Sequence, residues 1–499
     1  MFKISFFQQH KIPLLLAFAS VLFYLSFAYD LVRTDYTKLI TIYIALFFLF
    51  YMLIQITKHN IKLLTGIAFV FRAVFILAIP NLSQDFYRFI WDGRMILEGI
   101  NPYLYTVDSF ISNGNFPVAQ AQELYQGMGD LSAGHYTNYP PINQLCFIIA
   151  GLFTGKSILG ATIILRLIII GADFGTLYFG KKLLKKLNLP VHHIFWYILN
   201  PFIIIELTGN LHFEGLMIFF LIWSLYLLYA GKWQWAAVIL ALSISVKLIP
   251  LLFLPLFYQW FTSTPLRNQK KENAFTNLLT VFKDRLKGKQ SNTNKITTSP
   301  LVLTNDVIKG TAKLISFYSI VLLISILLFA PFYASEFVTN YTETVALWFQ
   351  NFEFNASLYY VARTIGYTFR GYNEIAIIGK YIAYIVIFFV LLLTFFRKNK
   401  TPIQLITALL IALSFYYFTA TTVHPWYVAT LLILSVFTKY KFPLVWSFMI
   451  MISYLAYANT DNTENLWIIG IEYIVVYAVF IWEVFFKYSE KEIITSSGY

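Results

Sequence analysis

Apolar runs of about 17 to 22 residues recur along most of the chain, separated by short polar turns and a few longer polar segments. A helix of about 20 residues crosses the hydrocarbon core of a bilayer, so each run predicts a transmembrane helix. The first run lacks a small-residue cleavage site and is followed by another, so we interpret it as an anchor rather than a signal peptide. The pattern predicts fourteen helices with both termini cytoplasmic, near residues 12–29, 38–56, 62–80, 158–180, 190–208, 215–230, 234–248, 251–262, 313–332, 379–396, 402–421, 427–438, 442–458 and 466–486.

Residues 142–155 are also apolar, but about 14 residues are marginal for a membrane span. A full crossing there would place the basic turn KKLLKK, residues 181–186, on the outer side. We therefore interpret 142–155 as a re-entrant or interfacial helix. A full crossing is the open alternative.

Composition supports a polytopic membrane protein. Only 12% of the residues are charged and 59% are hydrophobic, whereas soluble domains average about 25% charged residues. The net charge of +13 would indicate nucleic acid in a soluble protein, but here the distribution of charge reports orientation, and we expect no nucleic-acid partner. The chain has one cysteine, Cys146, so an intramolecular disulfide is impossible.

Lysine and arginine concentrate in cytoplasmic loops of membrane proteins. Segment 261–312 holds nine basic residues against three acidic ones, which predicts a cytoplasmic linker. Segment 81–141 holds six acids against two arginines, and 334–378 holds four acids against two arginines. We expect these two long loops to face outward.

The first outer loop opens with a charged stretch, SQDFYRFIWDGRMILEGINPY, residues 83–103. Residues 83–98 predict a short helix with Ser83 as its cap, because a hydroxyl and an early acid favour a helix start. Asp85, Arg88 and Asp92 would share one face of this helix. The alternative role for Arg88 is a salt bridge to Asp85 or Asp92 that holds the loop against the membrane.

Four later segments place further polar residues on the outer side. After the bend expected at Asn200-Pro201, an outer turn carries Asn210, His212 and Glu214, and Lys247 follows between two runs too short for comfortable spans. Such broken helices would aim a lysine into an outward site. The third segment is an aromatic and amide-rich stretch that carries Asn355. The fourth carries His424 and Trp426.

Each of these residues also has an ordinary explanation. Lys247 could extend its ammonium to the interface, the histidines could be interfacial, and Trp91 and Trp426 could be aromatic-belt anchors. Inside the predicted helices, Arg72 and Arg166 read as structural, and Asp173 lies seven residues after Arg166, so it could pair with it.

The ordered set of motifs resembles a known family. DFYRFIWDGRMILEGINPY is followed by NYPPINQ, NPF, GNLHFEG, SVKLIPLLFLP, FNASLY and HPWY. This series, spanning residues 62–460, resembles the bacterial polyprenyl-phosphate-mannose-dependent mannosyltransferases of the GT-C superfamily. The resemblance implies an all-α polytopic membrane protein: a GT-C-like bundle of about 13–14 transmembrane helices with a long outer loop carrying short helices. It also implies a lipid-phosphate-linked sugar donor and inversion at the anomeric carbon.

The resemblance also implies a set of site residues. The acid that opens the first outer loop is Asp85, our candidate general base, and Asp92 matches a second recurrent acid. Many relatives have aspartate where this chain has Glu214. No close Asp-x-Asp pair occurs in the loop, so divalent-metal use is left open, and no cofactor is assigned. In the mechanism that we expect, Arg88, Lys247 and His424 would hold the donor phosphate, and the sugar or the acceptor would contact Trp91, Tyr103, Asn210, His212, Glu214, Asn355 and Trp426.

The expected domain organisation follows from these boundaries. Residues 1–61 would form two additional N-terminal helices, 62–260 the catalytic core with outer loop 81–141, and 313–499 the C-terminal helices with outer loop 334–378. Segment 261–312 would be the basic cytoplasmic loop between the catalytic core and the C-terminal helices.

The expected function is transfer of a hexose, by resemblance mannose, from a polyprenyl phosphate to a hydroxyl of a glycan, glycolipid or protein acceptor. The expected location is a bacterial inner membrane, with the site facing the periplasm or exterior. A lipid or sugar transporter or flippase is the alternative from another class, although no similarity between the two halves supports it. A polymerase or ligase of lipid-linked glycans is the third. Sugar, acceptor and oligomeric state are not determined by the sequence.

Overall fold

The computed structural model describes residues 9–263, 300–459 and 463–487, except for the side chains of 300–306 and 348–350. Within these ranges the chain is helical, and its only β-type pairing is an isolated bridge between Phe354 and Thr422. The expected all-α class is therefore confirmed. Most of the basic loop expected at 261–312 lies outside the described residues.

Seven helices of the described chain are long and apolar enough to span a bilayer, and a bent pair, Val191–Ile198 with Pro201–Gly209 at 51°, would make an eighth. The seven are Lys11–Asp30, Tyr36–Thr57, Ile158–Lys186, Val307–Phe332, Ile375–Phe396, Pro402–Thr419 and Leu466–Lys487. Six shorter apolar helices are Pro141–Thr154, Glu214–Tyr229, Trp233–Ile244, Ile249–Thr262, Pro425–Val436 and Phe442–Ala458. The chain is a polytopic membrane protein, and the number of fourteen crossings stays a prediction.

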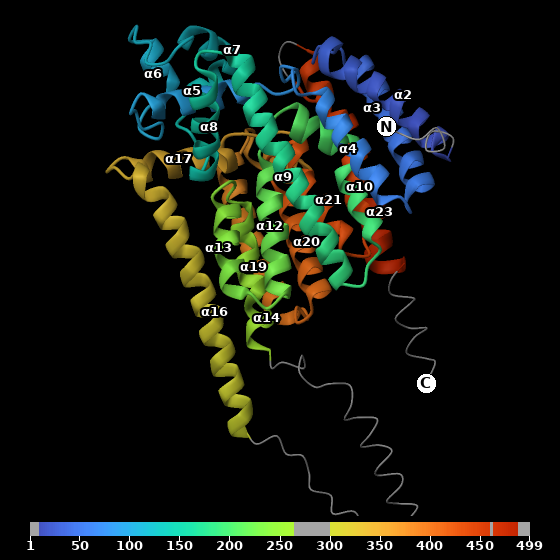
Figure 1. Ribbon diagram of the computed structural model, residues 1–499. Helices are drawn as coiled ribbons and strands as arrows, with labels where there is room; N and C mark the ends of the chain where they lie inside the picture. Colours follow the sequence, from blue (N-terminus) through green and yellow to red (C-terminus); the bar gives the residue numbers. More distant parts are fainter. Residues whose placement is uncertain (1–8, 264–299, 460–462, 488–499) are drawn as a thin grey trace, which may run out of the picture.

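The short helices of segment 81–141, the expected first outer loop, gather at one end of the bundle. These are α5 (Asp85–Leu97), α6 (Val107–Ile111), α7 (Ala121–Ala133) and α8 (Pro141–Thr154). Figure 1 shows them at the upper end with α17 (Phe337–Gln350), while α9 (Ile158–Lys186) descends through the bundle to the opposite end. This placement of α8 fits the re-entrant or interfacial interpretation, because α9 begins at the end of the molecule where α8 already lies.

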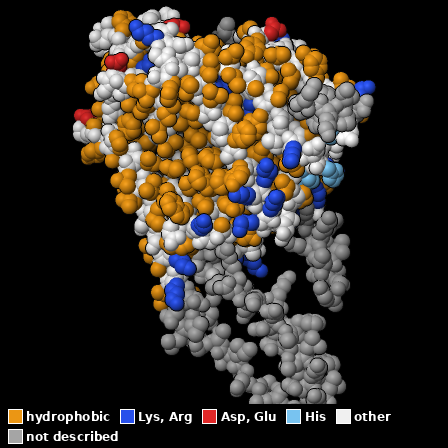
Figure 2. Space-filling view, in the orientation of Figure 1, with side chains coloured by type: hydrophobic (Ala, Val, Ile, Leu, Met, Phe, Trp, Pro, Cys, Tyr) orange, Lys and Arg blue, Asp and Glu red, His pale blue; other side chains and the backbone are white. Residues whose placement is uncertain are grey.

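Charge differs between the two ends. In Figure 2 the visible Lys and Arg side chains lie mainly along the lower part of the molecule, and Asp and Glu lie at the upper rim. The face between them is mostly hydrophobic. An apolar belt between a basic and an acidic end is typical of a membrane protein with its basic end in the cytoplasm.

The N-terminal hairpin consists of α2 (Lys11–Asp30) and α3 (Tyr36–Thr57), joined by loop 31–35. The next helix, α4, spans Ile61–Val74 and is shorter than the expected 62–80. Pro80 lies six residues beyond its end, and the chain between them has no regular helix. The connection brings the chain to the start of α5.

Close packing of α5 on α8 depends on Gly93. A Cβ added to Gly93 would lie 2.3 Å from the carbonyl oxygen of Phe147, so the two helices could not approach as they do with any larger residue. The rings of Phe89 and Phe147 stack beside this contact, with their centroids 4.6 Å apart. The contact fixes α5, and with it Asp85, on the rest of the protein.

One expected ion pair inside the bundle is wrong. Asp173 pairs with Arg72 from α4, with the Nε–Oδ2 distance at 2.7 Å, and not with Arg166. Arg166 instead donates to the carbonyl oxygens of Ile76, Thr208 and Gly209. Ile76 lies just beyond the end of α4, and Thr208 and Gly209 are the last residues of the π-helical η2 (Ile204–Gly209). The carbonyl groups at a helix end have no partner within the helix, so they can accept from Arg166. Both arginines are structural, as expected.

The remaining elements complete the bundle. They are η1 (Val191–Ile194), α10 (Phe195–Ile198), α11 (Pro201–Ile203), α12 (Glu214–Tyr229), α13 (Trp233–Ile244), η3 (Ile249–Phe257), α14 (Tyr258–Thr262), α16 (Pro300–Phe329), η4 (Ala330–Phe332), α18 (Leu358–Arg370), α19 (Ile375–Phe396), α20 (Pro402–Thr419), η5 (Pro425–Tyr427), α21 (Val428–Val436), α22 (Phe442–Met449), η6 (Ile450–Ala458), α23 (Leu466–Ile481) and η7 (Trp482–Lys487).

Candidate active site

Asp85 is the first residue of α5, and the Ser83 hydroxyl accepts a hydrogen bond from its backbone N–H at 3.3 Å. A carboxylate in the first turn interacts favourably with the helix dipole. The helix expected over 83–98 is observed over Asp85–Leu97, but its N-cap is Gln84 and not Ser83. The Asp85 residue is largely buried and keeps partial exposure.

Arg88 and Asp92 form a buried ion pair, with Nε and Oδ1 at 2.8 Å. This confirms the structural alternative considered for Arg88. Its guanidinium also donates to the carbonyl oxygens of Ser132 and His135, which lie in the segment leading to α8. Asp92 accepts a second hydrogen bond from Gln144 at 3.1 Å. These contacts occupy both residues inside the loop, so the geometry gives no support to a phosphate contact by Arg88.

The same network supports Tyr139. Its backbone carbonyl accepts a hydrogen bond from the buried Tyr103 hydroxyl at 2.6 Å, and Gln144 donates to the same oxygen at 3.4 Å. Tyr103 is surrounded by aromatic rings of the second outer loop, including Phe337. Trp91 is also fully buried, and its indole N–H points at the Met95 sulfur. Tyr103 and Trp91 therefore pack the loop that positions Tyr139.

Lys247 lies at the break that the sequence predicted. Helix α13 ends at Ile244 and the 3₁₀ helix η3 begins at Ile249, which leaves Lys247 in the turn between them. The start of α8 holds this turn: Ile142 N–H donates to the Ser245 carbonyl at 3.0 Å, and Asn143 donates to the Val246 carbonyl at 2.7 Å. The motifs NYPPINQ and SVKLIP are thus in direct contact.

The lysine ammonium connects three parts of the chain. It forms an ion pair with buried Glu214, with Nζ and Oε1 at 3.0 Å, and lies 5.7 Å from the centre of the Tyr139 ring. About a quarter (24%) of the Lys247 side chain remains exposed. Both Lys247 and Glu214 act electrostatically on Asp85, to which the Tyr139 hydroxyl also donates a hydrogen bond. Residues far apart in sequence therefore form one polar cluster of Asp85, Tyr139, Glu214 and Lys247.

Opposing influences set the pKa of Asp85. Burial raises the pKa above that of an ordinary aspartate, the Lys247 ammonium lowers it, the Glu214 carboxylate raises it, and the Tyr139 hydrogen bond lowers it. The net effect is a raised pKa. A base whose pKa lies closer to the working pH is a better proton acceptor, which suits Asp85 for general-base chemistry.

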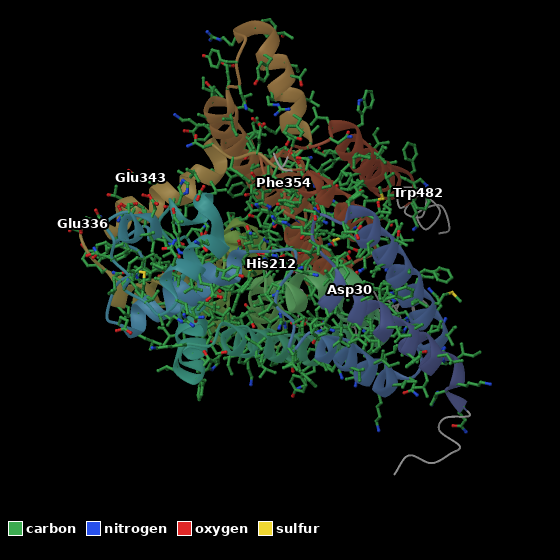
Figure 3. All side chains as sticks on the ribbon, turned by 90° about the horizontal axis from the view of Figure 1, so that it is seen from above. Asp30, His212, Glu336, Glu343, Phe354 and Trp482 are labelled. Carbon is green, nitrogen blue, oxygen red and sulfur yellow. The ribbon has the colours of Figure 1, made fainter. Side chains whose placement is uncertain are left out.

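His212 and His424 enclose Trp426. The His212 ring stacks on the indole with 3.6 Å between centroids, and the His424 ring is parallel to it at 4.6 Å. Two parallel imidazoles this close to one indole fit only on its opposite faces. Figure 3 shows His212 near the middle of the molecule in the view from above. Trp426 therefore packs between the two histidines, and its side chain stays partly exposed.

Both imidazoles are uncharged near neutral pH. Burial lowers the pKa of His424 to about 3, with a further contribution from Lys247. Burial also lowers the pKa of His212 well below its ordinary value, assisted by Lys247 and His424. These side chains can offer hydrogen bonds to a substrate, whereas the positive charge of the cluster comes from Lys247.

Asn210 and Asn355 lie in structural contacts. The side-chain oxygen of Asn210 accepts a hydrogen bond from the backbone N–H of Leu82, which lies three residues before Asp85. The side-chain amide nitrogen of Asn210 donates to the backbone carbonyl of Ile205. Asn355 is fully buried and donates to Glu472 at 3.2 Å. Asn210 thus ties the first outer loop to the π-turn, and Asn355 ties the second outer loop to α23.

Sequence reasoning did not select Tyr139, and it did not assign a role to Glu206. Glu206 is buried in the π-turn, accepts a hydrogen bond from Tyr454 at 2.9 Å and lies 3.7 Å from His212 Nε2. A signal for Tyr139 existed, because it stands in the quoted NYPPINQ motif before Pro140-Pro141. Among the residues whose side chains are described, no group of three His, Cys, Asp or Glu could hold a metal ion.

The fold and site define a polytopic α-helical membrane protein with a polar cluster at one end of its bundle. Residues 21–263 match the family model for alpha-(1->6)-mannopyranosyltransferase, N-terminal domain. The expected resemblance to mannosyltransferases is confirmed. This matched segment holds Asp85, Glu214 and Lys247.

A curated relative supports the same resemblance. The chain is 23% identical over 199 residues to alpha-(1->6)-mannopyranosyltransferase A of Mycobacterium tuberculosis (strain ATCC 25618 / H37Rv). The alignment covers 40% of this chain and spans 36% of the relative's length. No solved structure matches the chain.

Proposed function

We propose that this protein is an integral-membrane mannosyltransferase that moves mannose from a polyprenyl phosphate to an acceptor hydroxyl on the outer face of the membrane. The observation that carries the proposal is the cluster of Asp85, Tyr139, Glu214 and Lys247 within a segment that matches a mannosyltransferase family. The two N-terminal helices, the basic loop and the C-terminal helices would frame this core.

The proposed reaction uses Asp85 as the general base. Its carboxylate takes the proton of the acceptor hydroxyl while the hydroxyl oxygen bonds to the anomeric carbon. The bond from that carbon to the phosphate oxygen breaks, and the electron pair leaves with the polyprenyl phosphate. Attack opposite the leaving group inverts the anomeric centre, and the transition state has oxocarbenium character.

Lys247 supplies the positive charge for the leaving phosphate. A fixed cation next to developing negative charge stabilises the transition state more than the ground state. Glu214 holds the ammonium in place at 3.0 Å. His424, which is neutral, would donate a hydrogen bond to the phosphate or the sugar. The polyprenyl tail would lie against the apolar belt seen in Figure 2.

The arrangement of charge supports an outward-facing site. The cluster lies at the end of the bundle that carries α5 and α8, opposite the lower end where basic side chains gather (Figures 1 and 2). The concentration of Lys and Arg at the lower end supports a cytoplasmic position for that end. A lipid-linked donor suits this orientation, because nucleotide sugars are absent from the outer face.

Incubation of the purified protein with a panel of polyprenyl-phosphate sugars tests the proposal. We expect the mannose donor to be consumed, with release of polyprenyl phosphate and a product heavier by one hexose in the mass spectrum. Movement of labelled lipid or sugar across vesicles without any product would contradict the proposal and indicate a transporter. Consumption of an oligosaccharide donor alone would indicate a polymerase or ligase.

A further inference from the structure

A hollow with a volume of about 340 Å³ opens between α14 and the end of α19. One wall is formed by α14 and Ser263, and the other by the last turn of α19 and the turn that follows it, up to Lys400. Figure 1 shows α14 at the lower end of the bundle, opposite the end that carries α5 and α8. The hollow is therefore separate from the polar cluster around Asp85.

The Gln259 side chain joins the two walls. Its amide nitrogen donates to the backbone carbonyls of Thr394 and Arg397, each at 2.7 Å. Its side-chain oxygen accepts a hydrogen bond from the backbone N–H of Asn399 at 3.1 Å. The carbonyl groups in the last turn of a helix have no partner within the helix. Gln259 therefore satisfies the end of α19 and fixes the turn after it.

Close packing fixes α14 on α16. A Cβ added to Gly310 would lie 2.4 Å from the backbone carbonyl oxygen of Phe261, so the two helices can approach this closely because residue 310 is glycine. The rings of Phe261 and Phe317 also pack, with their centroids 5.2 Å apart. Both walls of the hollow are thus held in place by contacts within the protein.

Three cations line the hollow, namely Arg397, Lys398 and Lys400. None of the described residues that line it is acidic, and none of the three cations forms an ion pair with a carboxylate of the described chain. Like charges within four residues of each other repel, and a bound anion removes that repulsion. The charge of the hollow therefore favours an anionic ligand.

Arg397 is the fixed cation of the three. Its Nη1 donates to the side-chain oxygen of Asn399 at 2.8 Å and to the backbone carbonyl of Gln404 at 2.7 Å. The residue is partly buried. Within the described chain its Nε and Nη2 groups have no such acceptor. A guanidinium held in one plane presents these two donors as a pair, which matches two oxygens of a phosphate.

The apolar side of the hollow continues the exposed surface of α19. Phe396 is 82% exposed, and the Phe395 ring packs edge-on against Tyr258 with the centroids 5.4 Å apart. Phe388 and Leu392 are also exposed, and their spacing places them on the same side of the helix as these rings. We call Phe388, Leu392, Phe395 and Phe396 the α19 stripe. Because α19 is long and apolar enough to span a bilayer, acyl chains would cover the stripe, and the hollow begins at headgroup level.

We propose that this hollow binds the headgroup of an anionic phospholipid, as a structural lipid and not as a substrate. Arg397 binds the phosphate, Lys398 and Lys400 balance the remaining negative charge, and an acyl chain lies along the α19 stripe. A soluble anion would use the cations but not the exposed rings, whereas a phospholipid uses both. Basic pockets at the cytoplasmic ends of transmembrane helices suit such headgroups. This inference does not depend on the proposed function.

Binding of phosphatidylglycerol to the purified protein in neutral detergent micelles tests the inference. The double variant Lys398→Gln/Lys400→Gln keeps Arg397 and its hydrogen bonds, so the fold of the turn is retained. We expect its apparent Kd for phosphatidylglycerol to rise about tenfold, because two charges beside the headgroup are lost. Phosphatidylcholine, which has the same phosphate but no net charge, should bind the wild type about tenfold more weakly than phosphatidylglycerol.

The matched control is Lys181→Gln/Lys185→Gln, which removes two lysines from the end of α9. It should leave the Kd for phosphatidylglycerol unchanged. An equal rise in Kd in both double variants would overturn the inference, because any surface charge would then serve. Unchanged binding in Lys398→Gln/Lys400→Gln, or equal binding of the two lipids to the wild type, would also overturn it.

Two further measurements locate the ligand and identify its class. Phosphatidylglycerol with a photoreactive acyl chain should label residues of the α19 stripe, which peptide mass spectrometry detects. Labelling confined to other helices would contradict the site. Inorganic phosphate at the concentration of the lipid should not displace it. Displacement by inorganic phosphate would contradict the lipid assignment and indicate a site for a soluble anion.

Discussion

The ammonium of Lys247 and the carboxylate of Glu214 are 3.0 Å apart. This ion pair connects the turn between α13 and η3 to the start of α12, which follows the π-helical η2. The pair is nearly enclosed, because Glu214 is buried and Lys247 is only partly exposed. A buried carboxylate needs such a partner to remain charged. The pair therefore places one positive charge beside Asp85 in a defined position.

Replacement of Lys247 should weaken donor binding more than acceptor binding. Lys247→Ala removes the cation assigned to the donor phosphate, and we expect the donor Kd to rise about tenfold or more, as for the loss of a charge-assisted contact. Lys247→Ala also leaves the buried Glu214 carboxylate without its partner. In the double variant Lys247→Met with Glu214→Gln no unpaired charge remains, so weaker donor binding in that protein reports the loss of the phosphate contact and not the loss of the ion pair. Donor binding by the purified variants checks the effect.

Lys232→Ala is the control for this change, because Lys232 lies in the turn between α12 and α13, at the end of α12 opposite to Glu214. It should bind donor like the wild type. An unchanged donor Kd in Lys247→Ala would count against the phosphate assignment.

The pH dependence of transfer should follow Asp85. The base acts when deprotonated, so activity rises with pH through its pKa, which lies above that of an ordinary aspartate. Glu214 raises this pKa, and Lys247 and Tyr139 lower it. Glu214→Gln removes the raising influence, and we expect the acidic limb of the kcat/KM profile to move to lower pH.

Asp108→Asn is a suitable comparison, because Asp108 lies in the same outer loop and contacts Tyr125. It should leave the acidic limb in place. A limb that stays fixed or moves to higher pH in Glu214→Gln would show that Asp85 does not govern the profile.

Arg88 and Asp92 should affect stability more than donor binding. Loss of one member of a buried ion pair leaves the other charge uncompensated and costs about 3–5 kcal/mol. We expect Arg88→Met and Asp92→Asn each to lower the thermal unfolding temperature in detergent. The double variant should lose less than the sum of the two single losses. Donor Kd in the folded fraction should be unchanged, and a weakened Kd without loss of stability would instead support a phosphate contact by Arg88.

Hydrophobic pattern and charge predicted the helices and the break at Lys247, because both depend on local sequence. Lys247 was visible as a single cation between two short apolar runs, and the structure places it in that turn. The contacts of α8 with the same turn were not predictable, because nothing in a local pattern reports that Asn143 reaches Val246.

Side-chain roles were harder to predict than positions. Trp426 reads as a sugar platform from composition, but His212 from a distant segment and the neighbouring His424 both stack on its indole. Asn355 reads as a polar ligand, but its amide is turned inward to Glu472. Each of these depends on contacts between distant segments.

The most direct test of the central claim compares wild-type protein with Asp85→Asn, each incubated with polyprenyl-phosphate mannose and an acceptor. The account predicts that Asp85→Asn folds and binds the donor like the wild type, while transfer falls by a factor of about 10²–10⁴ or more, as expected for loss of a general base. Transfer by Asp85→Asn at the wild-type rate would contradict the account.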